Sequence, residues 1–285
     1  MVHQPDERLI KDFIVHSLAE DVGSGDYTSL ACIFSGSKQK ARLLVKDSGV
    51  IAGVSLAEEI LRHVDPNAEI TVYIPDGEEV GEGDVAFEVY GDTRALLMAE
   101  RTLLNVMQRM SAIATVSRSY AEEVEDLPVK ILDTRKTTPL LRFIEKWSVR
   151  IGGCYNYRDG LYDWIMIKDN HVDACGGISQ AISKVKEYLI KNSLDLGITV
   201  EVRNLNELKE TIECGGINRI MFDNFELPLL SEGVEIVNKR YETEASGGVN
   251  LRTVRKIAET GVDFISVGAL THSAGSLDLS FKFFA

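Results

Sequence analysis

Seven basic residues fall within residues 135–168, a stretch that contains only three acidic residues. The cations are Arg135, Lys136, Arg142, Lys146, Arg150, Arg158 and Lys168, and the anions are Glu145, Asp159 and Asp163. The whole chain carries a formal charge of −13, so this stretch is an island of opposite sign. Arginine binds carboxylates and phosphates through two parallel hydrogen bonds, and lysine binds them as a point charge. The stretch therefore indicates a site for a polyanionic ligand.

A solvated helix face is the alternative explanation for three of these cations. Arg142, Lys146 and Arg150 are spaced four residues apart, and we interpret them as one exposed side of a helix. The other cations fit this explanation less well. Arg135 follows the apolar run VKIL and Lys168 follows IMI, so each lies where a strand is expected to end.

Short apolar runs alternate with helical stretches after Leu127-Pro128, where the pattern of the chain changes. The runs are VKILD, WIMIKD, GITVEV, RIMFD, RYETEAS and DFISVG. This alternation is typical of parallel strands joined by helices, and six units are enough for a closed or nearly closed barrel. Their C-terminal ends carry Thr134-Arg135-Lys136, Lys168, Glu201, Asp223, Ser246-Gly247-Gly248 and Gly268. Because ligands bind at this edge of parallel α/β sheets, we expect the functional site there.

The other strand-end residues suggest two further kinds of binding. Glu201 and Asp223 suit a substrate cation, a developing positive charge or a metal ion, although simple charge balancing also explains them. EASGGV and SVGALTHS are small-residue loops that precede helical patterns. Such loops bind phosphate through backbone N–H groups and helix N-termini.

The first hundred residues mix strands and helices and predict an α+β module. Residues 6–20 have the apolar stripe of an amphipathic helix, and a strand pair is expected to turn at Asp47-Ser48-Gly49. A long helix begins near Thr93, its expected N-cap, with a buried stripe. The stripe comprises Leu96, Ala99, Leu103, Val106, Met107 and Met110. By pattern alone Arg101, beside this stripe, is a surface arginine.

Composition excludes several classes of protein. The chain of 285 residues is 45% hydrophobic and 26% charged, which is typical of a soluble globular protein. Its acidic balance argues against nucleic acid and anionic membranes as partners. The four cysteines show no metal-ligand spacing, and no apolar run approaches the ~20 residues of a membrane span. We therefore expect reduced thiols and a cytoplasmic location.

One family matches the motifs of the chain in order. They are DTRKTTP, EKWSVRIGG, NYRDGLYD, MIKDNHV, EVRNLNEL, IMFDNF, EASGGV and TGVDFISVGALTHS, with AERTLLNVMQRMSAIAT upstream. Together they closely resemble quinolinate phosphoribosyltransferase, also called nicotinate-nucleotide pyrophosphorylase (carboxylating). The resemblance covers nearly the whole chain and is most specific from Arg101 onward.

The resemblance implies an α/β fold with two domains. An N-terminal α/β sandwich (1–110) would precede an incomplete six- or seven-stranded α/β barrel (111–270), and a C-terminal segment (271–285) would return to the sandwich. It also implies a homodimer with shared active sites, in which the sandwich of one subunit covers the barrel mouth of the other.

The resemblance also implies a reaction. Quinolinate and phosphoribosyl pyrophosphate give nicotinate mononucleotide, pyrophosphate and carbon dioxide, with Mg²⁺, in de novo NAD biosynthesis. The implied carboxylate ligands are Arg135, Arg158, Lys168 and, from the neighbouring subunit, Arg101. Lys136, Glu201 and Asp223 are the implied catalytic residues: Lys136, with Lys168, would neutralise the departing pyrophosphate, and the acidic pair would stabilise positive charge on the ribose. The rest of the implied substrate-binding set is Thr134, Tyr157, Ser246, Gly247, Gly248, Val267, Gly268 and Ala269.

Two other functions and one departure from the family stay open. An aldolase-like barrel enzyme would use Lys168 as a Schiff-base nucleophile, and a non-catalytic relative would only bind pyridine carboxylates. Where the family usually has histidine, this chain has Tyr157. Tyr157 is expected to act as a neutral donor to a substrate carboxylate, with packing or an altered substrate preference as the alternatives.

Overall fold

The computed structural model describes residues 5–284 and separates the chain into two compact units. The first unit comprises the chain up to Arg118, Thr138–Gly153 and the chain from Ser273 onward. The second unit comprises Ser119–Thr137 and Cys154–His272. The domain limits expected above, at residues 110 and 270, stay a prediction.

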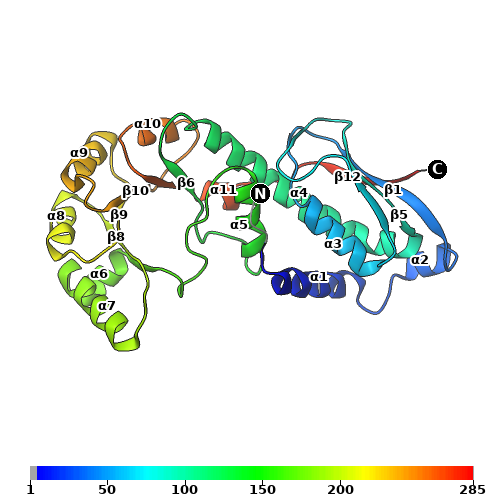
Figure 1. Cartoon of the computed structure of the whole chain (residues 1–285), viewed down its shortest axis with the longest axis horizontal. Helices are drawn as coiled ribbons and strands as arrows, with labels where there is room; N and C mark the ends of the chain where they lie inside the picture. The colour runs from blue at the N-terminus through cyan, green and yellow to red at the C-terminus, as the bar shows by residue number, and fades with distance from the viewer. Residues whose placement is uncertain (1–4, 285) are drawn as a thin grey trace. The chain divides into compact units, whose positions relative to one another are not determined.

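The first unit is built on an antiparallel sheet with helices beside it (Figure 1). The four-stranded sheet has the order β12-β1-β5-β3, and β2 pairs with β4 in a separate small sheet. The strands are β1 (Lys38–Val45), β2 (Gly49–Val50), β3 (Glu69–Val72), β4 (Glu79–Val80), β5 (Val85–Asp92) and β12 (Leu279–Phe284). The helices are α1 (Glu7–Val22), α2 (Tyr27–Cys32), α3 (Val54–Val64), α5 (Arg142–Ile151) and α4 (Thr93–Glu122), whose last turn belongs to the second unit.

The expected strand pair turning at Asp47-Ser48-Gly49 is wrong. β1 pairs with β5 and β12, whereas β2 pairs with β4. The reason is a close approach to helix α4. The Val50 N–H donates to the Thr115 hydroxyl (2.9 Å), and a Cβ on Gly49 would lie 2.5 Å from that same oxygen. The chain after β1 is therefore held against α4 and does not return beside β1.

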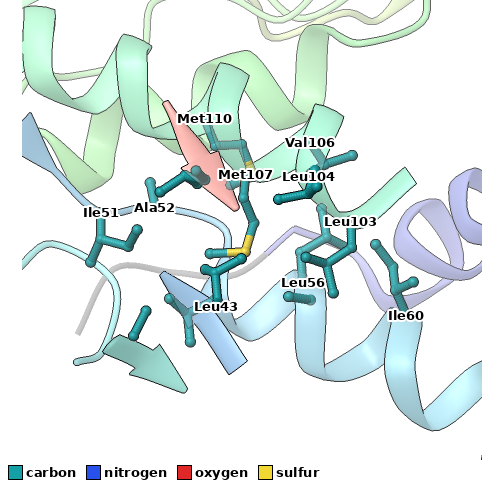
Figure 2. Packing of buried hydrophobic residues seen from close by; sticks show 14 of the residues in the cluster. Leu43, Ile51, Ala52, Leu56, Ile60, Leu103, Leu104, Val106, Met107 and Met110 are labelled. Atoms are coloured by element: carbon teal, nitrogen blue, oxygen red, sulfur yellow. The ribbon is translucent and has the colours of Figure 1, made fainter. Parts of the chain in front are cut away.

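Helix α4 confirms the predicted buried stripe and shifts its predicted cap. All six stripe residues are buried, and Leu103 and Met107 pack with Leu43, Leu56 and neighbouring side chains (Figure 2). The Asp92 carboxylate, and not the Thr93 hydroxyl, accepts from the third N–H of the helix, that of Ala95 (3.0 Å). The cap thus lies one residue earlier than predicted.

The solvated face predicted for Arg142, Lys146 and Arg150 is also wrong. All three lie on α5, but Lys146 is only 2% exposed and Arg142 and Arg150 are half-buried. The helix is held inside the unit by Glu145, which is fully buried. Its carboxylate forms an ion pair with Arg109 (2.9 Å), an interaction between distant segments that helical spacing cannot reveal.

The second unit contains a six-stranded parallel sheet of order β6-β11-β10-β9-β8-β7 (Figure 1). The strands are β6 (Lys130–Leu132), β7 (Ile165–Ile167), β8 (Ile198–Val202), β9 (Arg219–Asp223), β10 (Glu242–Ser246) and β11 (Phe264–Ser266). The helices are α6 (Asp169–Cys175), α7 (Ile178–Asn192), α8 (Leu205–Cys214), α9 (Leu227–Val237), α10 (Val254–Ala258) and α11 (Ala269–His272). All six predicted strands are confirmed. Within residues 5–284 the sheet stays open, because β6 and β7 are both edge strands and only an isolated bridge, Leu132 to Tyr155, extends it beyond β6.

The core of the first unit gives a stability prediction. Leu103→Ala should lower the free energy of unfolding by about 2–5 kcal/mol, because it removes a fully buried side chain and leaves a cavity. Urea denaturation followed by circular dichroism measures this loss. Leu9→Ala is the matched control, since Leu9 is 49% exposed, and should change stability much less. Equal losses for the two variants would contradict the packing described here.

Candidate active site

A cavity of about 1010 Å³ lies where the parallel strands of the second unit end. Nearly all the predicted site residues of this unit line it: Thr134, Arg135, Lys136, Tyr157, Arg158, Lys168, Glu201, Asp223, Ser246, Gly247, Gly248, Gly268 and Ala269. Val267 is not in the lining, because it is buried and its N–H donates to the Leu132 carbonyl (2.8 Å). Arg101 is not in the lining and belongs to the first unit, where it is part of α4.

The strand order arranges the charges of the lining in sequence around the cavity. The cationic segment Arg135-Lys136 follows β6, and the small-residue loops follow β11 and β10. The carboxylates come next, Asp223 at the end of β9 and Glu201 on β8. Lys168 follows β7 at the far edge. The cavity therefore has cations at both edges of the sheet, with phosphate-type loops and two carboxylates between them.

Arg135 and Arg158 form a like-charge pair within the cavity lining. Both side chains are half-buried. Burial, together with the charge of Arg135, lowers the pKa of Arg158 below the usual arginine value. The Nε of Arg135 is buried and has no hydrogen-bond partner within residues 5–284. A bound anion would offset the repulsion and satisfy this donor, so the pair suits a carboxylate or phosphate group.

Asp133 fixes the backbone that carries both arginines. This fully buried carboxylate accepts hydrogen bonds from the Tyr157 N–H (2.8 Å) and the Asn156 side chain (2.5 Å). The segment after β6 is held further by Thr271, whose hydroxyl donates to the Lys136 carbonyl (2.7 Å). The arginines are thus placed by backbone contacts that leave their guanidinium groups available to a ligand.

The two carboxylates have different partners. Glu201 is buried and forms an ion pair with the Lys168 ammonium group (2.8 Å). Asp223 accepts a hydrogen bond from the side-chain amide of Asn224 (3.0 Å). Asn224 has a left-handed backbone (φ 54°), which lets its side chain reach back to the residue before it.

Glycine is required in the loop after β10. Gly247 has φ 96°, and a Cβ there would lie 2.2 Å from the Asn224 side chain. Only glycine therefore permits both the turn of this loop and the position of the amide that bonds Asp223. The carboxylate and the loop are coupled through Asn224.

A second close approach brings a lysine and a histidine together over the loop after β11. A Cβ on Gly268 would lie 3.1 Å from the His272 ring and 3.1 Å from Cδ of Lys136. Both side chains also line the cavity. The absence of a side chain at Gly268 thus lets a cation and an imidazole converge there, an arrangement suited to phosphate oxygens.

Several lining residues were missed by the sequence analysis. They are Met166, Asp169, Asn170, Met221, Asn224, Val249, Ser266 and His272. Asn170 and Asn224 each follow a predicted site residue within two positions, so the motifs KDNH and FDNF contained a usable signal. His272 lies one helical turn after Gly268, and only the fold brings its ring to Lys136.

The Tyr157 hydroxyl has a partner inside the second unit. Its hydroxyl lies 2.6 Å from the Thr199 hydroxyl, and the two groups are hydrogen-bonded. Thr199 is fully buried and lies outside the cavity lining. Burial, together with the nearby charge of Glu244, raises the pKa of Tyr157 above its ordinary value, so the phenol is neutral near pH 7. The predicted neutral state agrees with this, and donation to a substrate carboxylate stays a prediction.

Comparison with known proteins identifies the family. The model of the quinolinate phosphoribosyl transferase C-terminal domain matches residues 113–282, and that of the N-terminal domain matches residues 26–111. The chain belongs to the quinolinate phosphoribosyltransferase family. An Arabidopsis thaliana relative named nicotinate-nucleotide pyrophosphorylase (carboxylating), chloroplastic, is 46% identical over 96% of this chain and 82% of its own length. A Bacillus subtilis relative named a probable nicotinate-nucleotide pyrophosphorylase (carboxylating) is 41% identical over 95% and 92%.

Solved structures of this family share the fold. NadC from Streptococcus pyogenes is 34% identical and superposes with a TM-score of 0.92 over 99% of this chain and all of its own. The nicotinate-nucleotide pyrophosphorylase of Francisella tularensis, also 34% identical, gives 0.91 over 100% and 99%. The expected combination of a sheet domain and an incomplete α/β barrel is therefore confirmed.

The position of the chain in the cell is a separate matter. Among residues 5–284, none of the helices has the length and apolar character needed to span a membrane. The cytoplasmic location expected from the sequence stays a prediction.

The loop after β10 gives a binding prediction for this quinolinate phosphoribosyltransferase family member. Gly247→Ala should weaken the binding of phosphoribosyl pyrophosphate about tenfold or more, because its Cβ displaces the Asn224 amide and the loop expected to hold the 5′-phosphate. Isothermal titration calorimetry measures the affinity. Gly261→Ala is the control: Gly261 has a similar φ of 87°, its Cβ would meet only the Val234 side chain, at 3.9 Å, and it lies outside the cavity. Equal weakening by both variants would show that backbone strain alone is responsible.

Proposed function

We propose that this chain transfers the phosphoribosyl group of phosphoribosyl pyrophosphate to quinolinate with decarboxylation. The products are nicotinate mononucleotide, pyrophosphate and carbon dioxide. The observation that carries this proposal is the pairing of Arg135 and Arg158 in a cavity that also holds two glycine loops and two carboxylates. Such a cavity matches a dicarboxylate, a phosphorylated ribose and a reaction in which positive charge develops between them.

Quinolinate would bind through its two adjacent carboxylates. Arg135 and Arg158 offer forked N–H donors on one side of the cavity, and Lys168 adds a point charge. The ribose 5′-phosphate would lie on the loops that contain Gly247 and Gly268, because backbone N–H groups approach phosphate closely where no side chain intervenes. This arrangement directs the pyridine nitrogen toward the ribose.

The chemistry requires stabilisation of charge and no general base. The pyridine nitrogen attacks C1′ of the ribose as the bond to pyrophosphate breaks, and the electron pair leaves with pyrophosphate. Glu201 and Asp223 stabilise the positive charge that develops on the ribose, and Lys136 neutralises the departing anion. The ring nitrogen is then cationic. It stabilises the electron pair that remains on the adjacent ring carbon when carbon dioxide leaves, and that carbon takes a proton.

The cavity fits a magnesium ion that arrives with the substrate. No group of three or more His, Cys, Asp or Glu residues within 5–284 is arranged to hold a metal by itself. Magnesium often uses one or two carboxylates with substrate phosphates and water, and Glu201 and Asp223 provide these two carboxylates. The ion would supply additional neutralisation of the pyrophosphate.

The Schiff-base alternative is disfavoured by the partner of Lys168. A Schiff-base lysine needs its nitrogen free to attack a carbonyl carbon, whereas Nζ of Lys168 is bound to the buried Glu201 carboxylate (2.8 Å). The non-catalytic alternative keeps the same cavity, so only turnover distinguishes it from the enzyme.

The proposed reaction predicts its own product. The purified protein with phosphoribosyl pyrophosphate, magnesium and quinolinate should form nicotinate mononucleotide, detected by mass spectrometry. Nicotinate in place of quinolinate should give none, and removal of magnesium with EDTA should abolish turnover because pyrophosphate loses its counter-ion. Tight quinolinate binding without product, over a range of pH and magnesium concentrations, would favour the non-catalytic relative.

We also propose a homodimer in which Arg101 completes the cavity of the neighbouring subunit. Arg101 is exposed and lines a groove of about 600 Å³ on the first unit. The groove also contains Leu140, which is 93% exposed and has a left-handed backbone (φ 68°) that is unfavourable for leucine. Arg101 has no ion-pair partner among residues 5–284, and an exposed apolar side chain in a strained conformation in the same groove suits contact with a second copy.

A shared site predicts complementation between inactive variants. Arg101→Ala and Lys136→Ala should each be nearly inactive, because each damages every cavity of its own homodimer. A mixed dimer has one cavity without either change, so random exchange should restore up to about one quarter of the parent activity. Subunit exchange is verified independently by mass spectrometry of labelled chains. No recovery after verified exchange would contradict the shared site.

A further inference from the structure

A chain of hydrogen bonds crosses the interior of the second unit. The Trp164 indole N–H donates to the Thr199 hydroxyl (2.8 Å), which in turn pairs with the Tyr157 hydroxyl (2.6 Å). The Tyr157 ring lies against the Arg219 guanidinium (5.0 Å to the centroid), and Arg219 donates to the Glu244 carboxylate (3.2 Å), which also accepts from Ser266. Thr199 and Glu244 are fully buried.

The indole fixes one direction in this chain of hydrogen bonds. An indole N–H can only donate, so Thr199 accepts from Trp164. The Thr199 and Tyr157 hydroxyls lie at hydrogen-bond distance, and either can be the donor. In both arrangements the Thr199 hydroxyl bonds two side chains at once, so its position depends on both neighbours.

The outer end of the chain leads to Arg158. The Trp164 carbonyl accepts a hydrogen bond from Nη1 of Arg158 (3.0 Å). The position of Trp164 is itself restricted, because its indole packs edge-on against Tyr157 (centroids 6.4 Å apart). It also lies so close to Gly197 that a Cβ there would be 2.3 Å from the ring. A shift of Trp164 would therefore move the acceptor that orients the Arg158 guanidinium.

The inner end of the chain is rigid. The Arg219 guanidinium lies over the Phe264 ring (3.8 Å to the centroid) and the Tyr157 ring (5.0 Å). Burial alone would lower the pKa of Arg219, but the charges of Glu244, Tyr157 and Glu242 and the hydrogen bond to Glu242 together outweigh it and raise the pKa. Arg219 is therefore a fixed cation that binds Glu244 and packs against the Tyr157 ring.

We propose that Thr199 is a positioning residue for quinolinate: through Trp164 it sets the orientation of Arg158 toward the substrate carboxylate. Tyr157 belongs to the same chain and supports Thr199 from the inside. This inference rests on the proposed function, because it assumes that Arg158 binds quinolinate. Neither hydroxyl needs to touch the substrate.

Two substitutions at Thr199 separate its hydrogen bonds from its shape. Thr199→Val has nearly the same outline but no hydroxyl, and it should raise the KM for quinolinate about tenfold, the effect of one hydrogen bond. The kcat and the KM for phosphoribosyl pyrophosphate should change less than about twofold, since those groups lie elsewhere in the cavity. Thr199→Ser keeps the hydroxyl and should restore the parent values.

A spectroscopic measurement follows the same chain without catalysis. The protein has two tryptophans, Trp147 and Trp164, so Trp147→Phe leaves Trp164 as the only fluorophore of that type. In this background Thr199→Val should shift the emission maximum of Trp164, because the indole N–H loses its partner. Thr199→Ser should not shift it.

A double-mutant cycle with Tyr157→Phe distinguishes an internal hydroxyl from a substrate donor. If the two hydroxyls act through one chain of hydrogen bonds, Tyr157→Phe as a single variant raises the quinolinate KM. Added to Thr199→Val, it should raise that KM little further. A hydroxyl bonded to substrate would instead multiply the two effects. If Thr199→Val does not fold, Thr199→Ala takes its place: a selective rise in the quinolinate KM supports the role of the Thr199 hydroxyl, and no rise overturns it.

The remaining outcomes separate this inference from the proposed function. No turnover of quinolinate by the parent protein would overturn the proposed function. An active, folded Thr199→Val with the parent quinolinate KM would overturn the positioning role alone. A uniform loss, in kcat and in both KM values, would also overturn it, because that pattern indicates general damage to the fold.

Discussion

The proximity of Arg135 and Arg158 is the constraint on which the second unit depends. Two half-buried guanidinium groups repel each other and lose hydration, and the lowered pKa of Arg158 expresses both costs. Asp133 holds the two arginines in place despite this repulsion. This buried carboxylate lies in the segment that leads to Arg135 and accepts the N–H of Tyr157, the residue before Arg158. The Asp133 carboxylate thus helps to set the separation of the two cations. An anion bound between them would offset their repulsion and their lost hydration.

The same principle explains why the interior of the barrel is polar. A row of cations at the cavity requires side chains that cannot shift, and apolar packing alone does not fix the rotation of a guanidinium group. Hydrogen bonds do, because their direction is specific. Arg158 is oriented by the Trp164 carbonyl, and Trp164 is tied through Thr199 to the buried pair of Arg219 and Glu244. Burying an ion pair costs desolvation free energy, and here the pair of Arg219 and Glu244 fixes the side chains around it.

The sequence was sufficient wherever the signal is local. All six parallel strands were predicted from short apolar runs, and because parallel strands end at one edge, the residues after them were predicted to meet. Long-range contacts were not predictable. Nothing in the sequence near Gly49 indicates that the segment after β1 bonds Thr115 of α4. Nothing in the spacing of α5 indicates that Glu145 pairs with Arg109 or that Lys146 is buried. His272 was missed for the same reason, since its approach to Lys136 depends on the glycine between them.

Tyr157 shows why a departure from a family pattern needs the fold for its interpretation. A motif position beside a substrate-binding arginine suggests a substrate contact, and that contact stays a prediction. The structure gives the hydroxyl a partner inside the barrel, Thr199, and places the ring against Arg219. Burial, together with the charge of Glu244, raises the pKa of Tyr157 and keeps the phenol protonated throughout the range where a histidine would change charge. A neutral hydroxyl suits this position, and its effect can reach Arg158 through Thr199 and Trp164.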